Sequence, residues 1–274
     1  MNRILLWVHA LLPWTGFCQK DPSKPYDSLD KYSYLIIGVR VDPNSPATLP
    51  FEERLQNVEY STGFFIRTAT GLYLVSAFHV FTDCEVYAGV FQDVRAEFLA
   101  VCYTDTLGKS KRQLLPLTYY RSKACRYFWD QPDVDTMNVT DYFKDACINS
   151  IEQLLPPLEP EQKRMAKGKK FICFGYPADK SDEYFSKNGD FPRHPCEYIR
   201  QQVNDSRYGP RISSMYVVIT PLLVRGTSGA PLFRVMRGRK RREFIQFAGI
   251  QSGSNNLYNH SLIVRPSELM KLLN

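Results

Sequence analysis

The segment Gly226 to Pro231 places Ser228 between two glycines, shortly after a run of residues typical of a β-strand. A serine hydroxyl is a poor nucleophile at neutral pH, so a hydrolase must expose it on a tight turn and direct backbone N–H groups at the oxyanion that forms. Glycine at position 226 permits a backbone conformation closed to other residues, which lets the N–H groups of Gly226 and Ser228 point into one small hole. The segment is therefore a candidate nucleophile with its oxyanion hole, although Gly-Ser turns also connect strands in all-β proteins.

A nucleophilic serine needs a base, and His79 has the best setting among the four histidines of the chain. Two apolar runs flank a short polar turn at Thr70-Gly71, and this pattern predicts a β-hairpin whose second strand delivers His79 at its end. The other candidates are His194 and His260, because His9 lies in a segment that we expect to be removed.

The third group should be a carboxylate that fixes the imidazole tautomer and stabilises the imidazolium formed during attack. Asp133 and Asp135 lie between His79 and Ser228 in the chain. On a strand the two carboxylates would share one face, so their spacing does not choose between them. Asp135 leads directly into a β-type run, whereas Asp133 follows Pro132 in a predicted turn. This difference favours Asp135 as the acid and leaves Asp133 as the alternative.

With these groups in the order histidine, aspartate, serine, the chain resembles the trypsin-like serine peptidases of the chymotrypsin fold, in particular their bacterial secreted members. The resemblance extends from about residue 32 to the C-terminus. It rests on the following segments: Leu74 to Val80, Asp133 to Asp135, Phe171 to Pro177, Gly226 to Phe233 and Phe247 to Gly253. It implies a serine endopeptidase in which a cleft between two six-stranded antiparallel β-barrels assembles His79, Asp135 and Ser228.

One departure from the family pattern leaves a second function open. Met137 and Asn138 stand where similar sequences carry small or aliphatic residues, so the strand after Asp135 is more polar than expected. The alternative is an inactive member of the same fold that binds peptides in its cleft. An α/β-hydrolase esterase is excluded, because its elbow requires glycine where Ala230 stands and its acid and histidine follow the serine.

The resemblance also implies a primary substrate pocket lined by Leu222 ahead of the serine and by Gln251, Ser252 and Gly253 after it. Leu222 carries no charge, so we expect uncharged side chains to be preferred over lysine or arginine. The histidine that glutamate-specific relatives carry near Gln251 is absent, and glutamate specificity is therefore not supported.

The rest of the chain has the pattern of an all-β protein, with short β-type runs separated by Gly, Pro, Asn and Asp and no long amphipathic helical pattern. A proline-rich, charged stretch at 154–168 predicts the connection between an N-terminal barrel at 32–153 and a C-terminal barrel at 169–274. Proline followed by apolar residues at helical spacing in Arg265 to Leu273 predicts a short C-terminal helix.

The first 18 residues have the short positive start and the apolar stretch of a signal peptide, and they are too short to span a membrane comfortably. Residues 19–31 are polar and contain proline, which indicates a linker or pro-segment. We expect an exported protein, periplasmic or secreted, with no transmembrane span after removal of the signal; a lipid anchor at Cys18 is the alternative. Export permits disulfides among the other six cysteines, but their spacing selects no pairing, and Cys173 in an apolar strand is expected to be a buried thiol.

The net charge of +7 is partly concentrated in Arg237 to Arg242, between two β-type runs. This pattern predicts an exposed basic hairpin tip, which could hold an anionic group but is more often simply solvated. The tip lacks interleaved aromatic residues, so no nucleic acid partner is expected. The predicted partner is a peptide or protein substrate, and no metal and no cofactor are expected.

Overall fold

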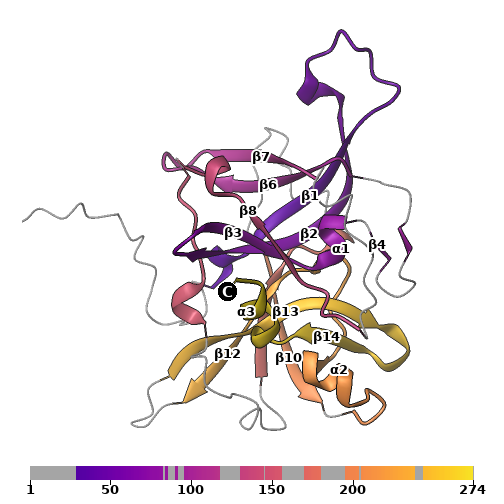
Figure 1. The fold of residues 1–274 in the computed structure, drawn as a ribbon, viewed down its shortest axis with the longest axis vertical. Coiled ribbons are helices and arrows are strands. Elements are labelled where there is room, and N and C mark those ends of the chain that lie inside the picture. Colours follow the sequence, from indigo (N-terminus) through magenta and orange to yellow (C-terminus); the bar gives the residue numbers. More distant parts are fainter. Residues whose placement is uncertain are drawn as a thin grey trace, which may run out of the picture.

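The computed structural model describes residues 29–82, 84–85, 90–91, 96–117, 130–144, 146–155, 170–179, 195–203, 205–237 and 243–273. Two β-sheet units lie one above the other, with the earlier part of the chain in the upper unit of Figure 1 and the later part in the lower unit. The predicted signal peptide, most of the predicted connection and the basic tip at 238–242 lie outside the described residues.

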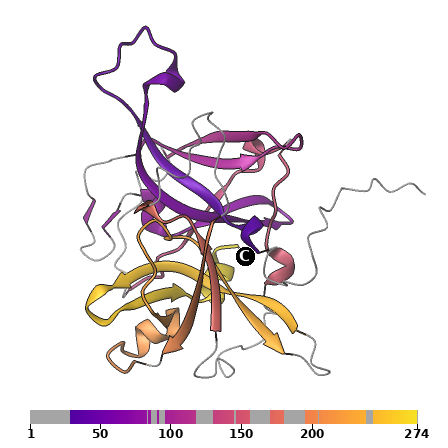
Figure 2. The ribbon, with the colours of Figure 1, turned by 180° about the vertical axis from the view of Figure 1, so that it is seen from behind.

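The first unit is a six-stranded antiparallel sheet with the order β7-β6-β1-β2-β3-β8. Its strands are β1 (Tyr34–Val41), β2 (Leu55–Thr68), β3 (Gly71–Ser76), β6 (Phe98–Thr104), β7 (Ser110–Pro116) and β8 (Asp135–Asn138). A separate pair is formed by β4 (Cys84–Glu85) and β5 (Val90–Phe91). The long β1–β2 hairpin extends beyond the body of the molecule in both Figure 1 and Figure 2.

The second unit is a closed six-stranded barrel with the order β10-β11-β14-β13-β12-β9. Its strands are β9 (Lys170–Gly175), β10 (Cys196–Val203), β11 (Tyr216–Thr220), β12 (Pro231–Arg237), β13 (Glu243–Asn255) and β14 (His260–Val264). The prediction of an all-β, chymotrypsin-like protein is therefore confirmed. Of the two predicted six-stranded antiparallel barrels, the second is a closed barrel and the first is a six-stranded antiparallel sheet.

Helices in the described residues are short. The α-helices are α1 (Phe78–Thr82), α2 (Pro210–Met215) and α3 (Pro266–Leu273), and the 3-10 helices are η1 (Asp30–Tyr32), η2 (Phe51–Arg54), η4 (Thr140–Tyr142), η5 (Glu152–Leu154) and η9 (Asn256–Tyr258). Helix α3 confirms the predicted C-terminal helix and contacts both β13 and β8, so it bridges the two units. None of the described helices is long and apolar enough to cross a membrane.

A continuous apolar cluster joins the two units. Phe64 of β2 and Phe247 of β13 are both fully buried, and their ring centroids lie 5.4 Å apart. Val75 and Val134 of the first unit belong to the same cluster. Full burial of one such side chain stabilises the fold by about 1.5–3 kcal/mol. Apolar packing thus fixes the relation between the units, and with it the position of any residue at their interface.

The β2–β3 hairpin confirms the turn predicted at Thr70-Gly71. Thr68 pairs with Gly71, whose φ of +149° lies in the region that favours glycine.

The polar residues of β8 also have a local explanation. Met137 is buried, whereas Asn138 is exposed and accepts hydrogen bonds from the N–H and hydroxyl of Thr140. The alternation along β8 is that of a strand with one buried face.

The four cysteines whose side chains are described are free thiols: Cys102, Cys147, Cys173 and Cys196. Cys173 is fully buried, which confirms its predicted environment. Burial raises the pKa of the Cys173 thiol to about 12, so this side chain is a neutral part of the barrel core at physiological pH.

Candidate active site

His79 lies in α1, directly after β3 ends at Ser76, so the predicted hairpin delivers it to one end of the first sheet. Its ring Nδ1 is 2.8 Å from Asp133 Oδ2, and its backbone N–H donates to Asp133 Oδ1 at 3.1 Å. The His79 side chain is 23% exposed, whereas that of Asp133 is 1% exposed. One buried carboxylate therefore fixes both the backbone and the ring of a histidine that remains accessible.

The acid beside His79 is Asp133, and the prediction that favoured Asp135 is wrong on this point. Asp135 is the first residue of β8 and pairs with Ser76, and its Oδ1 accepts a 2.8 Å hydrogen bond from the N–H of Thr136. Asp133 lies before the strand, where the N–H of Val134 donates to the carbonyl of Pro132. The two acids do not share a strand, so the alternation argument does not apply to them.

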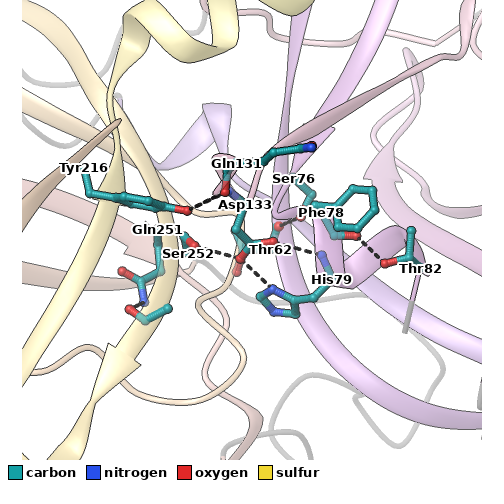
Figure 3. Close-up of polar contacts among 11 residues, drawn as sticks. Thr62, Ser76, Phe78, His79, Thr82, Gln131, Asp133, Tyr216, Gln251 and Ser252 are labelled. Atoms are coloured by element: carbon teal, nitrogen blue, oxygen red, sulfur yellow. Dashed lines mark hydrogen bonds and ion pairs between the residues drawn. The ribbon is translucent and has the colours of Figure 1, made fainter. Parts of the chain in front are cut away.

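Asp133 has two further hydrogen-bond partners in the second unit, a donor and an acceptor. Ser252 Oγ donates to Asp133 Oδ2 at 2.7 Å, and the N–H of Asp133 donates to the Tyr216 hydroxyl at 2.9 Å. The Tyr216 hydroxyl in turn donates to the carbonyl of Gln131 at 3.3 Å. Figure 3 shows His79 and Ser252 on opposite sides of Asp133. Sequence reasoning assigned Ser252 to the substrate pocket and missed Tyr216, because no local pattern links a strand tyrosine to a turn 83 residues away.

These contacts determine the protonation state of Asp133 and the tautomer of His79. Burial alone would raise the pKa of the Asp133 carboxyl, but the charge of His79 and the hydrogen bonds from His79 and Ser252 outweigh burial and hold this pKa below its usual range. Asp133 is therefore ionised at neutral pH. An ionised carboxylate only accepts hydrogen bonds, so Nδ1 of His79 carries the proton and Nε2 of the neutral ring has the lone pair that a base needs.

Both glycines around Ser228 have backbone conformations that disfavour other residues. Gly226 has φ +90° and Gly229 has φ +84°. A Cβ at Gly229 would lie 2.0 Å from Ser76 Oγ, and a Cβ at Gly226 would lie 2.4 Å from the backbone nitrogen of Ala178. The serine turn is therefore packed closely against its neighbours, and glycine is required at both positions.

The N–H of Gly226 is oriented by the peptide bond that precedes it. The carbonyl of Arg225 accepts a 2.8 Å hydrogen bond from the N–H of Ala178, and the N–H of a trans peptide points away from its carbonyl. Among the described residues, no acceptor takes a hydrogen bond from the N–H of Gly226 or of Ser228. The turn thus has two uncommitted donors, which is the requirement for an oxyanion site.

A cavity of about 870 Å³ lies against this turn. Its lining includes Ser228 and the predicted pocket residues Leu222, Gln251 and Ser252, and Gly253 lies beside them on β13. The other lining residues are Val58, Glu59, Tyr60, Ala178, Asp179, Leu223, Val224, Arg225, Ser254 and Asn256. Ser252 lines the cavity and also donates to Asp133, so one residue of the lining contacts the histidine–aspartate pair.

No family model and no curated protein matches this chain. Solved structures with a similar course of the chain include a thermostable serine protease, AL20, from an extremophilic microorganism, with 13% identity over 89% of this chain and 95% of that one and a TM-score of 0.47. The protease Anisep from Arthrobacter nicotinovorans has 16% identity, coverage of 89% and 94%, and a TM-score of 0.46. A Glu endopeptidase has 12% identity, coverage of 90% of each chain, and a TM-score of 0.47. At these low identities and scores, the function of this chain has to be inferred from its own residues.

Proposed function

We propose that the protein is a serine endopeptidase, and the two-point contact between buried Asp133 and His79 is the observation that carries the proposal. Ser228 Oγ attacks the carbonyl carbon of a peptide bond while His79 Nε2 takes its proton. The N–H groups of Gly226 and Ser228 stabilise the oxyanion. The protonated His79 then gives the proton to the leaving amine, and a water molecule hydrolyses the acyl-enzyme by the same steps.

The environment of Asp133 favours catalysis over simple peptide binding. Removing a carboxylate from water is costly unless it is paired and hydrogen-bonded, and here three donors from His79 and Ser252 compensate for it. A module that only binds peptides has no use for a buried acid that fixes the tautomer of a partly exposed histidine. Catalysis requires this arrangement, because the imidazolium formed during attack needs the negative charge.

We further propose that the reaction takes place in the periplasm or outside the cell. This proposal rests on the signal-like composition of residues 1–18.

The test of the function is covalent labelling of the purified protein by a fluorophosphonate, followed by peptide mapping in a mass spectrometer. We expect one modified residue, Ser228, because the probe reacts with a serine that has a base and an oxyanion site. Cleavage of casein then separates a peptidase from an esterase. Absence of labelling in a protein whose circular dichroism shows an intact β-fold would favour the peptide-binding alternative.

The cavity should also select the substrate residue on the acyl side of the cleaved bond. Leu222 lines the cavity with an uncharged side chain, and its backbone is fixed by hydrogen bonds from its N–H to Asn259 and from Arg200 to its carbonyl. We therefore expect a peptide library to show cleavage after uncharged side chains.

A negative charge at position 222 should change which substrate side chain is preferred on the acyl side of the cleaved bond. Leu222→Asp is expected to raise the relative kcat/KM for lysine or arginine by about tenfold, which corresponds to roughly 1.4 kcal/mol. Leu222→Asn is the matched control, since it has a similar shape without the charge and should leave the preference near that of the natural protein. Cleavage by the natural protein mainly after lysine or arginine would contradict the assignment of this pocket.

A further inference from the structure

Thr62 of β2 makes two hydrogen bonds to the serine turn. Its N–H donates to the carbonyl of Ser228 at 2.9 Å, and its Oγ1 donates to the carbonyl of Gly226 at 3.0 Å. Its own carbonyl accepts a 2.8 Å hydrogen bond from Ser76 Oγ. The Thr62 side chain is fully buried and does not line the cavity, so it has no direct access to substrate.

The Thr62 hydroxyl has a fixed orientation because it accepts one hydrogen bond and donates another. It accepts a 3.0 Å hydrogen bond from the N–H of Tyr176, just beyond the end of β9, and it donates to the carbonyl of Gly226. Since its single proton goes to Gly226, the hydroxyl joins two separate segments of the second unit.

These contacts matter because Gly226 has no side chain to restrict its backbone. The peptide before Gly226 is held by the bond from Ala178 N–H to the Arg225 carbonyl, and the peptide after it is held by Thr62 Oγ1. The N–H of Thr227 points the other way, to the carbonyl of Val224 at 3.3 Å. Both peptide planes at Gly226 are therefore fixed. Loss of the Thr62 bond would leave the second plane held only by the longer 3.3 Å bond from the Thr227 N–H to Val224.

We propose that Thr62 is a positioning residue for the oxyanion site: its hydroxyl holds the Gly226 carbonyl so that the N–H groups of Gly226 and Ser228 remain directed at the oxyanion. The proposal rests on the proposed peptidase function. Thr62 touches no reacting atom and acts only through the conformation of the serine turn. Its effect should appear in the transition state, where the oxyanion carries its charge, and not in binding of the ground state.

The test compares Thr62→Val, which keeps the shape and loses the hydroxyl, with Thr62→Ser, which keeps the hydroxyl. Removing one oxyanion donor costs on the order of 10²–10³ in kcat, so we expect Thr62→Val to lower kcat by about 10²-fold and to change KM by less than about threefold. A peptide boronic acid, which mimics the tetrahedral state, should bind Thr62→Val more weakly by about the same factor as the loss in kcat/KM. Thr62→Ser should recover most of the activity and of the inhibitor affinity.

Two further variants separate positioning from a loss of folding. Ser33→Ala removes another buried hydroxyl, one that donates to the carbonyl of Phe174 on β9 and not to the serine turn, and we expect its kcat to stay within about threefold of the natural value. Thr62→Ala replaces Thr62→Val if thermal denaturation shows that valine prevents folding, and the same loss in kcat and inhibitor affinity is expected. Unchanged kcat and boronic acid affinity in a folded variant that lacks the hydroxyl would overturn the proposal. Failure of the peptidase function itself would be recognised separately, because the natural protein would then neither cleave peptides nor react with a fluorophosphonate.

Discussion

Ser228→Ala is expected to lower the rate of peptide hydrolysis by about 10⁶-fold, to a level set by the remaining oxyanion donors and substrate binding. The alanine side chain lacks the oxygen that forms the acyl-enzyme, so covalent labelling should disappear as well. His79→Ala should cause a similar loss, because members of a nucleophile–base pair act as a unit and their effects are not additive. Single-turnover kinetics with a chromogenic peptide measure these losses.

A matched control is Ser214→Ala on helix α2. Ser214 is exposed and its Oγ donates to the carbonyl of Arg211 within the same helix, so the change removes a serine hydroxyl without contact with the cavity. Its activity and labelling should equal those of the natural protein. Full peptidase activity in a folded Ser228→Ala variant would exclude the proposed nucleophile.

Asp133→Asn is expected to lower kcat by about 10⁴-fold, because an amide does not supply the negative charge and does not favour the tautomer with the proton on Nδ1. Asp135→Asn should change kcat by only a few-fold. The Asp135 Oδ1 accepts from the adjacent Thr136 N–H, whereas both carboxylate oxygens of Asp133 contact His79. Steady-state kinetics of both variants, across a pH series that covers the titration of histidine, measure the difference.

The two asparagine variants control for each other. Both replace a buried carboxylate with an amide of the same shape, two residues apart, so general disruption of the 130–138 segment should affect both. Thermal denaturation of each variant shows whether a loss of activity reflects unfolding. A large loss in Asp135→Asn together with normal activity in Asp133→Asn would contradict the assignment made from the structure.

Several features could be predicted from the sequence because neighbouring residues determine them. Glycine at 226 and 229 indicated the unusual backbone of the serine turn, and Gly71 between two apolar runs indicated the hairpin that precedes His79. Proline followed by an apolar helical pattern gave the C-terminal helix. Each of these depends on local backbone conformation and side-chain periodicity, which a short stretch of chain expresses without reference to the rest.

The identity of the acid and its supporting contacts depended on the tertiary structure. Asp133 and Asp135 are both acidic residues near one strand. The pairing of β3 with β8 in the first unit brings Asp133 to His79, 54 residues away in the chain, and the packing of the two units brings it to Ser252, 119 residues away. The bond from Thr62 to Gly226 spans 164 residues. The sequence by itself determined the chemistry available, a serine between glycines and a histidine after a strand. The tertiary structure decided which buried polar groups meet, because hydrogen bonds at about 3 Å require the two units to be packed in one fixed relation.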